Sequence, residues 1–150
     1  MKIAVFIFGD NSNVTWDFIT TLNCDVYTSI NNTNLIQCWK DCLNQINGKD
    51  YDIIILSDSN NSITTSSDYS NFLNYTKDCA LYSTRSIYHI GLNDFWIDED
   101  FLMGNFNVMS SFINLLPNNV NNVSELGRTI VELGYYVDVV RDIQIKTRKI

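Results

Sequence analysis

Two uninterrupted apolar runs constrain the fold of this chain more than any other feature of its sequence. Residues 3–8 read IAVFIF, and residues 53–56 read IIIL. A strand with one face in water alternates apolar and polar side chains, whereas a run without alternation belongs to a strand that is covered on both faces. Such strands lie in the middle of a mostly parallel sheet with helices on both sides. The two runs therefore predict an α/β protein.

Segments of helical and strand character alternate between these two runs. The sequence predicts a strand over residues 25–30 and two helices, one carried by Val14, Phe18, Ile19 and Leu22 and the other by Leu35, Trp39, Cys42 and Ile46. Asn47-Gly48 is a typical end for the second helix. The resulting β-α-β-α-β order is that of a doubly wound sheet. We therefore expect residues 1–150 to form one domain, a three-layer α/β/α fold with a mostly parallel central sheet of the Rossmann-like kind.

The second half of the chain is less regular. We expect helices over residues 67–82, 105–116 and 122–134, strands over 86–90 and 135–145, and a polar loop around 60–67. Asn122 with Glu125 forms a capping box for the last helix, and Pro117 ends the one before it.

Composition and charge exclude several classes of function. The net charge of −7 argues against a nucleic-acid partner, because phosphate backbones are bound by clustered Lys and Arg. No apolar segment has the length of a membrane span or the form of a leader peptide. The four cysteines show no C-x-x-C spacing, and Cys38 and Cys42 fall on one face of a predicted helix, which favours reduced thiols in a cytoplasmic protein rather than a zinc site.

The ends of the first and third strands are the first candidate site. Ligands of doubly wound sheets bind beyond the carboxyl ends of the strands. Gly9, Asp10 and Asn11 follow the first strand, and the third runs into Asp58. Backbone N–H groups after Gly9 suit a phosphate, and Asp58 suits a metal or phosphate-handling role. The alternatives are a simple helix N-cap after Gly9 and a polar turn at Asp58.

A second candidate site is the acidic and aromatic segment 91–101. It combines four acids, including Asp94, with three aromatic residues. Carboxylates that hold hydroxyl groups beside aromatic rings suit a sugar, and one carboxylate can act as a base toward an acceptor hydroxyl. An acidic surface loop is the alternative. His89, the single histidine, falls inside a predicted strand, which favours a packed residue over a general base.

Taken together, these segments resemble small glycosyltransferase-like proteins of the nucleotide-diphosphosugar transferase (GT-A type) fold, as found in bacterial surface-glycan loci and in large viruses or phages. The resemblance rests on the opening strand with Gly9, Asp25-Val26-Tyr27, Tyr51 to Ile55, Asn93-Asp94-Phe95, the helix Phe106 to Phe112, and the closing segment from Ser124 through Gly134 to Val140. Where that family has a pair of acids that hold a divalent ion, this chain has Asp58 alone.

The resemblance implies transfer of a sugar from a nucleotide-sugar donor to the hydroxyl of a glycan acceptor. Gly9, Asp10 and Asn11 would contact the nucleotide, Asp58 would hold the diphosphate through Mn²⁺ or Mg²⁺, and Asp94 would be the base. One alternative is a non-enzymatic virion or assembly protein that keeps the fold and has protein partners, in the cytoplasm of a host cell. A flavodoxin-like or response-regulator-like domain is another, because it shares the β-α-β-α-β opening.

Overall fold

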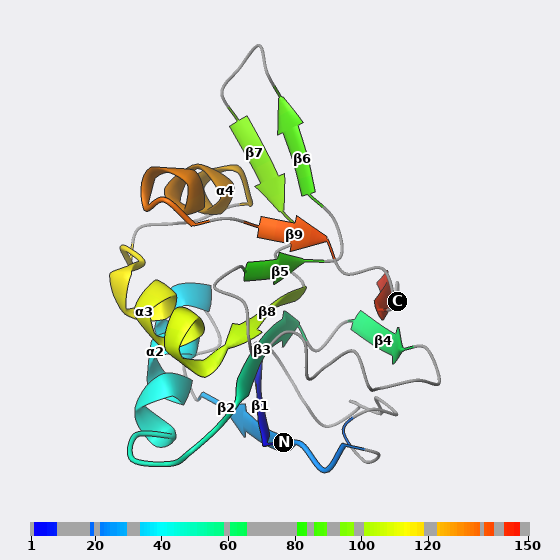
Figure 1. Ribbon diagram of the computed structural model, residues 1–150, viewed down its shortest axis with the longest axis vertical. Coiled ribbons are helices and arrows are strands. Elements are labelled where there is room, and N and C mark those ends of the chain that lie inside the picture. Colours follow the sequence, from blue (N-terminus) through cyan, green and yellow to red (C-terminus); the bar gives the residue numbers. More distant parts are fainter. Residues whose placement is uncertain are drawn as a thin grey trace.

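A six-stranded sheet forms the centre of the computed structural model, which describes residues 2–8, 19, 22–29, 34–58, 61–65, 81–83, 86–89, 94–97, 101–118, 123–135, 137–139 and 143–147 (Figure 1). Across the sheet the strands are β2 (Asp25–Thr28), β1 (Ile3–Phe8), β3 (Ile53–Asp58), β8 (Phe101–Asn105), β5 (Leu81–Ser83) and β9 (Val137–Val139). β1 pairs in parallel with β2 and with β3, and β5 pairs in parallel with β9. β8 runs antiparallel to β3 and to β5. The predicted α/β class is confirmed, with a mixed sheet.

Helices cover one face of this sheet and build its core. α2 (Leu35–Gln45) and α3 (Phe106–Leu115) pack against each other and against the strands, and α4 (Val123–Glu132) adds two buried side chains to the same core. The shared core contains Phe6, Ile54, Leu56, Trp39, Phe112 and Ile130, each of them completely buried. The helical stripes predicted from the sequence are therefore the faces that pack on the sheet.

Local signals define the ends of α2 and α3. The Asn34 side chain accepts a hydrogen bond from the Gln37 backbone N–H at 3.0 Å, and Asn105 does the same for Val108 at 2.9 Å. Both are N-caps that satisfy a helix donor. After α2 the chain turns through Gly48, whose φ of +81° lies in the left-handed region that favours glycine.

The opposite face of the sheet is also buried. Ile3, Val5 and Ile7 of β1 alternate with the residues that face α2, yet none is more than 1% exposed. This double burial is the reason that β1 and β3 read as continuous apolar runs. The helix predicted over residues 14–22 lies outside the described residues except for Ile19, which is helical, and Leu22, which is in a turn, so a third layer stays a prediction.

Two small sheets were missed or misread in the sequence. β4 (Asn61–Thr65) pairs antiparallel with β10 (Ile143–Thr147), although residues 60–67 were predicted to form a loop. β6 (Ser86–His89) confirms a predicted strand, and its partner β7 (Asp94–Ile97) is a strand in the acidic segment 91–101, for which no strand was predicted. The single strand predicted over residues 135–145 is wrong, because β9 and β10 belong to different sheets. Long-range pairing decides all of these cases, and a local pattern does not report it.

The helix predicted over residues 67–82 extends too far at its carboxyl end, because Leu81 and Tyr82 belong to the strand β5. Leu81 is fully buried, and its apolar character fits a strand as well as a helix. Residues 66–80 lie outside the described part of the chain. None of the described helices is long and apolar enough to cross a bilayer.

Truncation of Phe112 tests the packing of α3 on the sheet. Phe112 is fully buried, and its ring contacts Tyr135 edge-to-face with centroids 5.4 Å apart. We expect Phe112→Ala to lower the free energy of unfolding by about 3–5 kcal/mol through lost burial and a residual cavity. Leu115→Ala on the same helix is the control, since Leu115 is 56% exposed and should change stability by less than about 0.5 kcal/mol. Urea denaturation measures both, and equal losses would contradict the assigned faces of α3.

Candidate functional site

The carboxyl ends of β1 and β3 lie side by side at the point where the strand order reverses. β2 pairs on one side of β1 and β3 on the other, which makes this edge a topological switch point. The last residues of the two strands are in register, with Phe8 opposite Asp58. Gly9 follows Phe8 directly in the chain. The strand that precedes the first predicted site segment therefore ends beside Asp58, while Gly9, Asp10 and Asn11 themselves lie outside the described residues.

The last residue of the acidic segment 91–101, Phe101, also lies at this edge. Because β8 is antiparallel, its first residue Phe101 lies opposite Ser57, beside the carboxyl end of β3. Asp94 instead begins β7, opposite His89 in the separate β6–β7 sheet. In Figure 1 this hairpin projects from the main sheet, and β7 runs back toward it, so Asp94 is at the far end of β7. Seven Cα-to-Cα steps separate Asp94 from Phe101, a reach of at most about 25 Å. The role of Asp94 as a base stays a prediction.

Behind this edge, the Asp41 carboxylate joins α2 to the end of β2. Ser29, only 8% exposed, donates its hydroxyl to Asp41 Oδ2 at 2.8 Å, and Gln37 Nε2 donates to Asp41 Oδ1 at 2.9 Å. The sequence analysis did not predict this contact of Asp41 with Ser29 and Gln37. The one pattern that indicates it is the spacing of Gln37 and Asp41, which are one helical turn apart. Within the described residues no three His, Cys, Asp or Glu side chains gather as a metal cluster.

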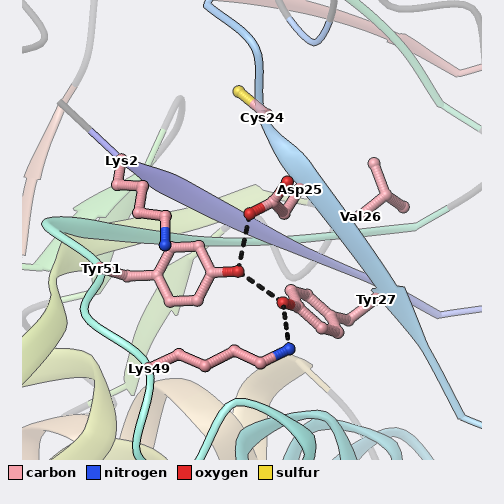
Figure 2. A pocket seen from close by; sticks show the side chains of 7 residues that line it. All are labelled: Lys2, Cys24, Asp25, Val26, Tyr27, Lys49 and Tyr51. Carbon is pink, nitrogen blue, oxygen red and sulfur yellow. Dashed lines mark hydrogen bonds between the residues drawn. The ribbon is translucent and has the colours of Figure 1, made fainter.

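A second polar site lies at the opposite, amino edge of the same strands (Figure 2). Tyr51 precedes β3, and its hydroxyl contacts the Asp25 carboxylate at 2.8 Å and, closely, the Tyr27 hydroxyl. Lys49 Nζ reaches the Tyr27 hydroxyl at 3.3 Å and lies 5.3 Å from the centre of the Tyr27 ring. Lys2 Nζ lies 5.0 Å from the centre of the Tyr51 ring. β1 and β3 are six residues long, so this site is roughly 17 Å from the Asp58 edge.

The hydrogen bonds in this network can point in only one direction. A phenol has a single O–H, and that of Tyr51 donates to Asp25. Tyr27 is therefore the donor to Tyr51, and Lys49 donates to Tyr27. A continuous chain of donors then links the Lys49 ammonium to the Asp25 carboxylate through two phenols. Such a chain is polarised along its length, which strengthens each bond in it.

Burial keeps the Tyr51 phenol neutral. Tyr51 is 7% exposed, and loss of water, followed by its hydrogen bonds to Tyr27 and Asp25, raises the pKa of the phenol well above its usual value. Beside it, burial and the nearby Asp25 raise the pKa of the half-buried Cys24 thiol to about 12. Cys24 is therefore a thiol near neutral pH and not a nucleophile.

The remaining described cysteines are structural. Cys38 and Cys42 are reduced and fully buried on α2, and the Cys38 thiol lies 3.8 Å from the Ile7 carbonyl oxygen that accepts from it. The hydrogen bond from Cys42 lowers the pKa of Cys38, and that same bond together with burial raises the pKa of Cys42. The prediction of buried, reduced thiols is confirmed for this pair, while Cys79 lies outside the described residues.

Comparison with known proteins finds a similar fold and no family. No family model matches the chain, and no curated protein matches it. Among solved structures, the crystal structure of the viral protein A197 from STIV superposes with a TM-score of 0.65 at 10% identity. The match covers 98% of this chain and 85% of that one. At this identity the likeness shows the α/β fold alone.

Replacement of Tyr51 by Phe tests the donor chain. Tyr51→Phe keeps the ring and removes the O–H, so we expect a loss of about 1 kcal/mol in the free energy of unfolding at pH 7. The folded pKa of Tyr51 is raised, so its stabilisation is complete below the unfolded pKa of about 10 and is lost as pH rises above it. The stability difference between the two proteins should therefore shrink from pH of about 9 to about 11 in urea titrations. A constant or growing difference would refute the donor chain.

Proposed function

We propose that this chain is a glycosyltransferase-like protein that moves a sugar from a nucleotide-sugar donor to an acceptor hydroxyl at the β1–β3 edge. The observation that carries the proposal is the register of Phe8 with Asp58 at the switch point of the sheet. It puts the backbone of Asp58 beside Phe8, the residue that precedes Gly9 in the chain. The resemblance to the nucleotide-diphosphosugar transferase fold, including Asn93-Asp94-Phe95, supports the same reading.

The residues have separate roles in this proposal. Backbone N–H groups of the Gly9, Asp10 and Asn11 turn bind the nucleotide, because such groups present donors to phosphate oxygens. Asp58 is an oxygen ligand of the kind that Mg²⁺ and Mn²⁺ accept, with the diphosphate and water as the other ligands. The cation would supply charge neutralisation of the diphosphate.

Asp94 has the role of general base. Its carboxylate takes the proton of the acceptor hydroxyl, and the acceptor oxygen forms a bond to the anomeric carbon of the sugar. The bond from that carbon to the diphosphate breaks, and the nucleoside diphosphate leaves with the electron pair. Asp94 begins β7, which belongs to a different sheet from the strand of Asp58.

A non-enzymatic role in a virion or assembly is the second candidate. Two observations favour it. The structurally similar A197 from STIV is a viral protein, and Asp58 stands alone where the resembled family has two acids. Such a protein would keep the sheet and bind protein partners in place of a nucleotide-sugar.

Calorimetry with a panel of UDP-, GDP- and CDP-sugars in the presence of Mn²⁺ separates the two candidates. We expect one donor class to bind and Asp58→Ala to weaken its binding at least about tenfold, since a cation-bridged contact is lost. Asp50→Ala is the matched control, because Asp50 is an exposed acid beyond the amino end of β3. Circular dichroism verifies that both variants fold.

The two results that count against the enzyme are distinct. No binding of any donor by the wild-type protein would remove the enzyme proposal and leave the assembly role. Binding that Asp58→Ala leaves unchanged would show that the nucleotide site does not include Asp58.

A further inference from the structure

The amino-edge pocket has the dimensions of a small-molecule site. It is formed by Lys2, Cys24, Asp25, Tyr27, Lys49 and Tyr51, and its volume is about 770 Å³ (Figure 2). Ligand pockets in proteins range over about 300–1,000 Å³. Nothing in the function proposed above uses this pocket, which lies at the opposite end of β1 and β3.

The charges at the pocket select an anion. Two ammonium groups and one carboxylate line it, in a protein whose net charge is −7. The Asp25 carboxylate already accepts the Tyr51 O–H at 2.8 Å. Asp52 does not line the pocket, and its Oδ2 accepts the Lys2 backbone N–H at 2.7 Å. The lining of the pocket therefore carries a net positive charge, and the Asp52 carboxylate adjoins it at the Lys2 backbone.

The two ammonium groups keep most of their donors available. Each carries three N–H donors. Lys49 gives one of them to Tyr27, and Lys2 lies over the Tyr51 ring without a hydrogen bond from its Nζ to any residue in the described part of the chain. Cation–π contact holds an ammonium in place without using a hydrogen-bond acceptor. Both ammonium groups are thus positioned by aromatic rings, and neither uses all of its donors on the described residues.

The other groups disfavour a thiol nucleophile and a metal ion at this pocket. The phenols of Tyr27 and Tyr51 are committed to the donor chain, and Cys24 is protonated because the pKa of its thiol is about 12. Asp25 is the one carboxylate that lines the pocket. A cation would meet two ammonium groups and one occupied ligand, which disfavours it. Val26, 39% exposed, points away from this group on the other side of β2 (Figure 2).

We propose that the pocket between Lys2 and Lys49 binds the phosphate group of a small molecule at the amino edge of the sheet. A phosphomonoester carries about −1.5 to −2 charges at pH 7 and three acceptor oxygens. It matches two ammonium groups, whereas a carboxylate would neutralise only one of them. Lysine binds phosphate as a point charge, which suits the open position of both side chains.

Amide NMR during titration with inorganic phosphate, phenyl phosphate and acetate tests the site at matched ionic strength. At a pH of about 7.5 the phosphates are mostly dianions. We expect saturable shifts at Lys2, Asp25, Tyr27 and Lys49 with both phosphates and weaker binding of acetate. Tighter binding of phenyl phosphate identifies an organic phosphate as the ligand, and equal binding identifies the inorganic ion.

Charge-removing variants decide whether the two lysines are responsible. Lys2→Gln and Lys49→Gln should each weaken phosphate binding by about tenfold, the loss of one charge-assisted contact. Lys40→Gln is the matched control, because it removes the same charge from α2, where Lys40 contacts Asn118 at 3.0 Å. An equal loss in Lys40→Gln, acetate binding as tight as phosphate, or the absence of shifts at these residues would each overturn the proposal.

Discussion

The parallel, in-register pairing of β1 and β3 is the constraint on which the rest of the structure depends. Their paired residues run from Ile3 opposite Ile53 to Phe8 opposite Asp58. Both faces of the pair are buried, so a shift in register would place polar residues in the core at either end. Beyond the amino end of this pairing, two hydrogen bonds join Asp52 to the Lys2 backbone. Asp52 Oδ2 accepts from the Lys2 N–H, and the Asp52 backbone N–H donates to the Lys2 carbonyl oxygen.

This pairing gives the two edges of the sheet opposite chemical character. The carboxyl edge receives Asp58, and Phe101 of β8 begins beside Ser57 there. The amino edge receives two lysines, each over a tyrosine ring. Both proposals follow from this polarity, since an acid with backbone donors suits a cation-bridged diphosphate and two ammonium groups suit a phosphate directly. Because the two sites share no side chain, a result that contradicts one proposal leaves the other unaffected.

The sequence predicted the first half of the fold well because its elements are defined by local patterns. The IAVFIF run, the stripe through Trp39 and the Asn47-Gly48 turn each report burial or backbone geometry within one element. It predicted the Asp58 edge for the same reason, since β-α-β order implies where strands end. The sequence did not predict β4, because the polar segment NSITT is as typical of a loop as of a strand. Its pairing with β10, far along the chain, makes it a strand.

The sequence by itself determined the α/β class, the buried strands, the helix faces and the reduced state of Cys38 and Cys42, since burial and helical periodicity are written into neighbouring residues. Only the tertiary structure decided that β8 inserts antiparallel beside β3, that Asp94 begins a separate hairpin, and that Asp25, Tyr27 and Tyr51 join in one donor chain. These features depend on contacts between segments that are distant in the chain. Local patterns contain no information on such contacts, because many pairings satisfy the same pattern.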